Sequence, residues 1–142
     1  MTFDASATTR ATAEVLSYLA HKIYLANYAD GLKPSQWVAL RYFSKTNPSA
    51  STLTAFADQI GCTKGTASRT VQHLIRRGLL HRTENPRDAR SSLLALTASG
   101  ASALENDPIR ELEKQLAKLG ADDQRLLQDL LIRLMKPSVP RS

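Results

Sequence analysis

The feature that most constrains the fold of this 142-residue chain is the stretch from Thr52 to Thr97. Apolar residues recur there at spacings of three and four on both sides of the tripeptide Gly61-Cys62-Thr63, which is typical of helices that bury one face. Glycine tolerates the left-handed backbone that ends a helix, and the Thr63 hydroxyl can cap the helix that follows. The stretch therefore predicts two helices set at an angle by a tight turn.

The second of these helices, expected from about Lys64 to Arg77, has a polar face of hydrogen-bond donors and short hydroxyls. That face comprises Lys64, Thr66, Ser68, Arg69, Gln72, His73 and Arg76. Such side chains suit phosphate oxygens and base edges. Moreover, no Asp or Glu occurs between Gln59 and Thr83, within a chain of net charge +6. The pattern favours nucleic acid as the partner.

A basic hairpin is expected next, from a strand over 79–82, a loop over 85–89 and a second strand over 92–96. A lone two-stranded hairpin is marginally stable, so its leucines are expected to pack on the helices. Such a ribbon after a helix-turn-helix is a wing. The fold class predicted is mainly α with a small two-stranded β-wing.

Further helices are predicted on both sides of this motif, over about 9–28 and 34–45 and again from Thr97, with a break at 106–108. We expect a single domain over 1–142, with its winged helix-turn-helix at about 33–100 and dimerisation helices at about 9–30 and 101–136. Leucines continue at helical spacing through 109–135, more than a small monomer is expected to cover. We interpret the two ends as a homodimer interface; the alternative is that they pack on their own chain's core.

Several functional classes find no support in the composition. A single cysteine excludes an intrachain disulfide and a zinc site of several thiolates, and the three histidines are scattered, so no metal or other cofactor is expected. The sequence contains neither a nucleophile elbow nor a glycine-rich loop that would indicate catalysis. We therefore expect a protein that is not an enzyme. Neither a membrane-spanning apolar run nor a signal peptide is recognisable, which predicts a soluble cytoplasmic protein.

The motifs together resemble the MarR family of bacterial winged helix-turn-helix regulators. The resemblance rests on Pro34-x-Gln36-Trp37, the segment from Gly61 to Leu74, Gly78-Leu79-Leu80-x-Arg82, Pro86-x-Asp88-x-Arg90 and Leu94-x-Leu96-Thr97-x-x-Gly100. It implies a homodimer on a roughly palindromic operator, released by a small ligand or an oxidant. The chain departs from the family pattern at Cys62, where Val is favoured, and at Lys33, where a hydroxyl cap is common.

The DNA contacts expected lie on the predicted recognition helix, on the wing and at another helix start. On the helix they are Thr63, Lys64, Gly65, Thr66, Ser68, Arg69 and Arg76, with Arg69 placed to pair bidentately with guanine. On the wing they are Arg87 and Arg90, and Arg90 is expected in a minor groove. Asp88 is expected to orient an arginine by a salt bridge or hydrogen bond. Ser35 and Gln36 are backbone contacts that the resemblance implies.

An effector site is a further hypothesis. A pocket between the first two helices and the start of the C-terminal helix is expected to hold a small aromatic ligand. Its predicted lining is His21, Tyr24, Tyr28, Trp37 and Arg41, with Arg41 holding a carboxylate. The alternative is that these aromatics belong to the core.

Two further functions stay open at the level of sequence. Cys62 lies near a helix N-terminus and Lys64, a setting that favours a thiolate and hence redox sensing, although its slot in the turn suits a small buried hydrophobe. A winged helix can also serve as a protein-interaction adaptor. The absence of acidic residues from 59–83 argues against the adaptor.

Overall fold

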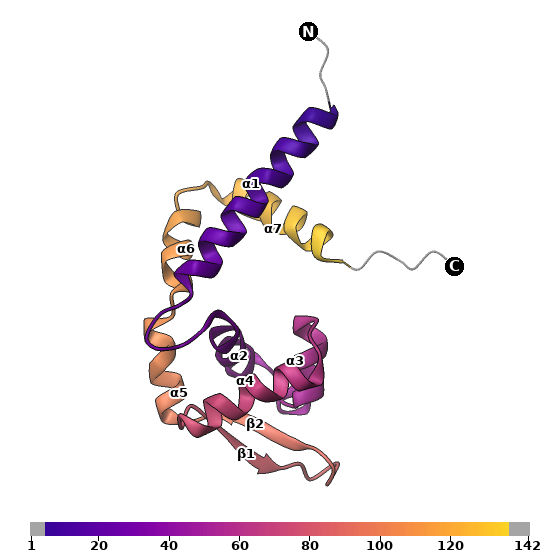
Figure 1. Cartoon of the computed structure of the whole chain (residues 1–142), viewed down its shortest axis with the longest axis vertical. Coiled ribbons are helices and arrows are strands. Elements are labelled where there is room, and N and C mark those ends of the chain that lie inside the picture. Colours follow the sequence, from indigo (N-terminus) through magenta and orange to yellow (C-terminus); the bar gives the residue numbers. More distant parts are fainter. Residues whose placement is uncertain (1–4, 137–142) are drawn as a thin grey trace, which may run out of the picture. The chain divides into compact units, whose positions relative to one another are not determined.

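The computed structural model describes residues 5–136 of the chain (Figure 1). It comprises two compact units, a first that ends at Pro108 and a second that begins at Ile109. The first unit contains α1 (Ala5–Ala26), α2 (Pro34–Lys45), the 3-10 turn η1 (Pro48–Ala50), α3 (Leu53–Ile60), α4 (Lys64–Arg76), β1 (Leu80–Glu84), β2 (Ser92–Leu96), α5 (Ala98–Ala103) and η2 (Leu104–Asn106). The second contains α6 (Ile109–Leu116) and α7 (Ala121–Met135).

The hydrophobic core of the first unit lies between α2, α3, α4 and the hairpin. Its largest fully buried side chains are Trp37, Leu40, Val71, Leu74 and Leu80. An aromatic cluster of Tyr42, Phe43 and Phe56 joins α2 to α3, with ring centroids 5.0–5.3 Å apart. The core therefore fixes the two helices of the central motif against α2.

The turn between α3 and α4 has the predicted chemistry. Gly61 adopts a left-handed conformation with φ +75°, and its N–H donates to the Ala57 carbonyl at 2.9 Å. The Thr63 hydroxyl accepts from the Thr66 N–H at 3.2 Å, as a helix N-cap does. The predicted helix-turn-helix is confirmed, with α4 ending at Arg76 rather than Arg77.

The wing is an antiparallel hairpin in which Leu80 pairs with Leu96. Backbone hydrogen bonds attach it to the rest of the unit, from Leu94 N to the Ser51 carbonyl before α3 at 2.7 Å and from Leu79 N to the Leu74 carbonyl of α4 at 2.9 Å. Leu94 is buried in the core. These bonds and leucines supply the support that an isolated hairpin lacks.

Element boundaries differ from the sequence prediction in a few places. Helix α1 begins at Ala5 and ends at Ala26, because the chain then turns through Asp30 and Gly31, both with positive φ, and closes a bridge between Ala29 and Leu32. The 3-10 turn η1 follows α2, and β1 begins one residue later than predicted and extends to Glu84. The break predicted at 106–108 separates η2 from α6.

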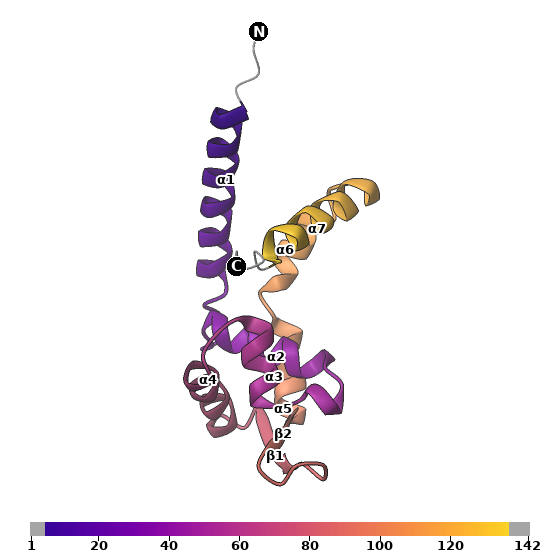
Figure 2. The ribbon, with the colours of Figure 1, turned by 90° about the vertical axis from the view of Figure 1, so that its right-hand side faces the viewer.

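Two helices carry large apolar side chains on exposed surface. Helix α1 has no buried residue and extends away from the α2–β2 body of its unit in both views (Figures 1 and 2). Its exposed apolar residues include Val15, Tyr18, Leu19, Tyr24 and Leu25. In the second unit, α7 likewise exposes Leu126, Leu130, Leu131, Ile132, Leu134 and Met135. No described helix is both long and apolar enough to cross a membrane.

Candidate nucleic-acid interface

Helix α4 has one buried and one exposed face, and Figure 2 shows it at an edge of the first unit. Ala67, Val71 and Leu74 are buried in the core. The exposed residues are Lys64, Gly65, Thr66, Arg69, Gln72 and Arg76, while Ser68 is half-buried. The core contacts therefore hold the predicted polar face outward.

At the start of α4, three side chains form a hydrogen-bonded chain. The hydroxyls of Thr63 and Thr66 lie 3.0 Å apart, and Arg69 Nη2 donates to Thr66 Oγ1 at a long 3.5 Å. Because Thr63 also caps the helix, this chain ties the Arg69 guanidinium to the helix N-terminus. An anion at this end meets both the positive end of the helix dipole and an arginine.

The tip of the wing is shaped by two acceptor side chains. Asp88 Oδ1 accepts from the Arg90 backbone N–H at 2.9 Å, and Asn85 Oδ1 accepts from the Arg87 N–H at 3.0 Å. Asn85 also donates to Ser91 Oγ at 3.0 Å. Asp88 thus acts on the backbone of Arg90, and the side chains of Arg87 and Arg90 are both exposed at the tip.

The start of α2 corrects one expectation. Ser35 is exposed, whereas Gln36 is only 6% exposed and its Oε1 accepts from the Lys33 backbone N–H at 2.9 Å. The Gln36 amide oxygen therefore satisfies the Lys33 N–H at the start of its own helix, and this buried side chain is not retained among the proposed DNA contacts.

Two arginines at the end of α4 have different surroundings. Arg76 is exposed on the polar face. Arg77 donates from Nη1 to the Gly31 carbonyl at 2.7 Å and so joins the end of α4 to the loop between α1 and α2. Of the two, Arg76 is the one left to meet a phosphate.

The predicted effector pocket is not assembled as expected. Trp37 is fully buried in the core, and Arg41 is held by Asp107 and Asn27, so its guanidinium is not free for a ligand carboxylate. His21, Tyr24 and Tyr28 are exposed instead. The Tyr24 and Tyr28 hydroxyls lie 2.9 Å apart, and this hydrogen bond, with smaller contributions from burial and charge, raises the pKa of Tyr28 above its ordinary value.

The surroundings of Cys62 and the placement of the His, Asp and Glu side chains bear on the redox and metal hypotheses. Cys62 is half-buried and packs against the core, as a small hydrophobe does. Within residues 5–136, no cluster of three or more His, Cys, Asp and Glu side chains is placed to hold a metal ion.

Two residues emerge from the structure that the predicted site lacked. Gln72 lies on the exposed face of α4; its sequence position places it on the polar face of this helix, but it is not among the expected DNA contacts. Asn85 shapes the wing tip, but its neighbours in the loop give no signal that separates it from an ordinary turn residue.

Comparison with known proteins agrees with this geometry. A sequence model described as MarR family matches residues 30–91. A probable transcriptional regulator from Pseudomonas aeruginosa is 28% identical, with a TM-score of 0.69, over 85% of this chain and 94% of its own. The transcriptional regulator PcaV from Streptomyces coelicolor, solved with its natural ligand, is 25% identical, with a TM-score of 0.69, over 94% and 96%.

A third structure shows the same fold at lower identity. The S. aureus MepR–DNA complex is 20% identical to this chain, with a TM-score of 0.69, and the match covers 94% of this chain and 98% of that one. No curated protein matches the sequence. The helix-turn-helix, the wing and these matches define a winged helix-turn-helix DNA-binding regulator. The match to the MarR family model covers α2, the helix-turn-helix and the first strand of the wing.

Proposed function

We propose that this protein is a homodimeric repressor that binds a pseudo-palindromic operator in double-stranded DNA. The observation that carries the proposal is the exposed face of α4, which is basic and hydroxyl-rich and lies in a segment without acidic residues from Gln59 to Thr83. At 13 residues α4 is about 20 Å long, a length that fits a major groove.

The proposed DNA contacts divide by groove. In the major groove they are Thr63, Lys64, Gly65, Thr66, Ser68 and Arg69, with Arg76 and Ser35 on the phosphate backbone. In the minor groove Arg90 is the reading residue and Arg87 lies beside it, because narrow A·T tracts concentrate negative potential there. The turn that Asp88 holds supports this assignment by fixing the Arg90 backbone.

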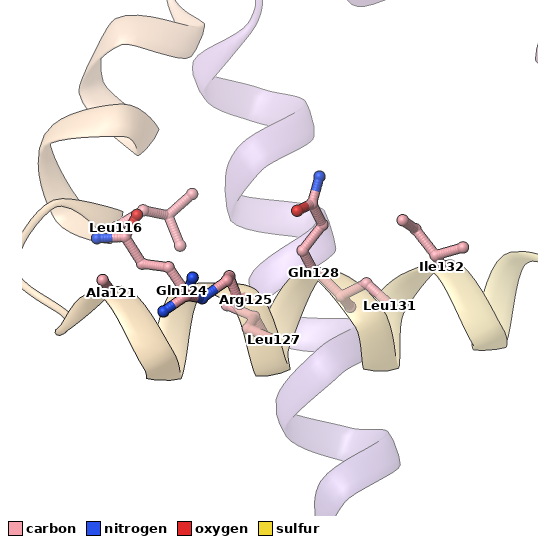
Figure 3. Close-up of a pocket in the computed structure, with 8 residues that line it drawn as sticks. All are labelled: Leu116, Ala121, Gln124, Arg125, Leu127, Gln128, Leu131 and Ile132. Atoms are coloured by element: carbon pink, nitrogen blue, oxygen red, sulfur yellow. The ribbon is translucent and has the colours of Figure 1, made fainter.

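The apolar surfaces of α1 and α7 support the homodimer. Figure 3 shows a groove of about 630 Å³ in the second unit, lined by residues of α7 and by Leu116 from the end of α6. Most of its lining is aliphatic. Contiguous exposed apolar surface marks interaction sites, and we assign this one to a second copy of the chain. Two copies would place their α4 helices roughly 34–36 Å apart, one turn of DNA.

Repression and effector release are the finer parts of the proposal. A dimer seated on an operator blocks other proteins from the same DNA, and a ligand that prefers the unbound dimer geometry releases it. The PcaV structure with its natural ligand supports a small-molecule effector. Of the predicted pocket lining, His21, Tyr24 and Tyr28 are exposed and are proposed to receive one. Calorimetric titration with phenolic carboxylic acids is expected to give heat, and its absence would contradict that site.

A fluorescence-anisotropy titration tests the proposal. The purified protein is titrated against DNA from its own upstream intergenic region, with scrambled competitor, at two salt concentrations. Specific binding of two protomers per site, weakening steeply with salt, is the expected result because several phosphates are neutralised. If scrambled competitor displaces the labelled DNA as well as the specific sequence does, the protein is a general DNA binder. No binding would favour an interaction adaptor.

A further inference from the structure

The outermost ridge of α4 is defined by the residues directly opposite its buried face. Successive residues of an α-helix are rotated by about 100°, so the direction opposite Ala67, Val71 and Leu74 can be derived from the buried positions. Gly65, Arg69, Gln72 and Arg76 all lie within about 50° of that direction. Their spacing of four, three and four residues makes them one continuous row along the helix.

Gln72 occupies the middle of this ridge, between two arginines. It is exposed and uncharged, unlike its neighbours Arg69 and Arg76. Phosphate contacts alone favour cations, whereas an amide carries both a donor and an acceptor and can distinguish bases. Gln72 therefore places an uncharged side chain suited to base recognition between the two cations of the ridge.

Ser68 orients the Gln72 amide. Gln72 Nε2 donates to Ser68 Oγ at 3.3 Å, one turn earlier on the same helix. That bond uses one of the two Nε2 hydrogens and leaves the second hydrogen and the Oε1 lone pairs facing other partners. In the major groove, adenine presents an N7 acceptor and an N6 donor, which match this donor and acceptor pair.

We propose that Gln72 reads an A·T base pair in the major groove, with Ser68 as its positioning residue. The proposal rests on the proposed function, since it requires α4 to enter that groove. Arg69 precedes Gln72 by three residues, a rise of about 4.5 Å along the helix axis, which lies between one and two base-pair steps of roughly 3.4 Å and is nearer to one. Each half-site therefore contains a G·C pair read by Arg69 beside the A·T pair read by Gln72.

The test uses the full-length protein and an operator selected from random-sequence DNA. Every base pair of one half-site is then substituted in turn, and affinities are measured for the parent, Gln72→Ala, Gln72→Glu and Ser68→Ala. The parent is expected to lose roughly tenfold in affinity at the assigned A·T pair, and Gln72→Ala to lose that discrimination only there. Gln72→Glu is expected to prefer cytosine at the same position, because a carboxylate accepts from its N4 amino group.

The outcomes separate this inference from the proposed function. Ser68→Ala is expected to reduce discrimination at the same pair because it releases the Gln72 amide. Gln115→Ala removes an exposed glutamine from α6 and is expected to change the preference at no position. If the parent binds specifically and both Gln72→Ala and Gln72→Glu show the same base preferences as the parent at every position, the role of Gln72 is overturned but the proposed function stands. A parent for which no sequence is enriched overturns the proposed function as well.

Discussion

Arg41 and Asp107 form a two-pronged ion pair across 66 positions of sequence, with Nε donating to Oδ2 at 2.7 Å and Nη2 to Oδ1 at 2.6 Å. Asp107 is 7% exposed, and Nη2 also donates to Asn27 Oδ1 at 2.8 Å. The guanidinium thereby joins α2 to the segment after η2 and to the residue that follows α1. A planar fork of this kind fixes orientation as well as distance.

Replacing Asp107 by Asn should destabilise the first unit strongly. The change leaves the Arg41 charge largely buried without its counter-ion, and breaking a buried pair costs about 3–5 kcal/mol, with the lower end expected because Arg41 is partly exposed. Urea unfolding followed by fluorescence of Trp37, the single tryptophan, measures the loss. The control is Glu14→Gln, which breaks an exposed pair with Arg10 and should have little effect. Equal midpoints for the two variants would contradict the structural role.

A side chain at Gly100 should be incompatible with the way α5 packs. A Cβ there would lie far inside van der Waals contact of the Leu79 carbonyl oxygen, which is itself held by the Thr97 N–H. Gly100→Ala is expected to lower the free energy of unfolding by at least the roughly 1–3 kcal/mol typical of overpacking. Thermal and urea unfolding measure it. An unchanged stability would mean that the backbone between β2 and α5 moves freely.

Gly65→Ala should separate stability from DNA binding. Its Cβ would meet only Thr63 Oγ1 at 3.9 Å, and alanine favours a helix over glycine by about 0.5–1 kcal/mol, so stability should hold or rise. The same Cβ stands on the outermost ridge of α4 and should keep the backbone from the groove floor, weakening operator affinity. Anisotropy and unfolding experiments on one preparation give both quantities. Full affinity in a stabilised protein would place the DNA farther from Gly65.

The sequence was most informative where local chemistry decides the structure. The Gly61 turn, the Thr63 cap and the paired strands follow from residue types at short spacing, and each is confirmed. The partner of Arg41 could not be predicted in this way, because Asp107 lies 66 positions further along the chain. Gln36 has the spacing of a capping box with Lys33, but position 33 lacks the hydroxyl that usually marks one.

Arg90→Ala tests the wing. Removing the guanidinium should weaken binding most to operators with A·T-rich flanks, because the narrow minor groove there attracts an arginine. Affinity for flanks rich in A·T and in G·C is compared by anisotropy for the parent and the variant. Lys45→Ala, which removes an exposed cation from the end of α2, serves as the control and should leave the flank preference intact. If Arg90→Ala binds with the same affinity and the same flank preference as the parent, the minor-groove assignment is overturned.

Leu130→Glu tests the homodimer. Leu126, Leu130 and Leu134 recur every fourth residue on α7, and all three are exposed, Leu130 by 43%. A carboxylate in the middle of this row would be buried without a partner in a dimer, at a cost that favours the monomer. Sedimentation velocity should show dissociation, and operator affinity should fall because one protomer contacts one half-site. Gln115→Glu adds the same charge on α6 and should remain dimeric, with Trp37 fluorescence confirming that both variants keep the folded core. A dimeric Leu130→Glu protein would exclude this row from the interface.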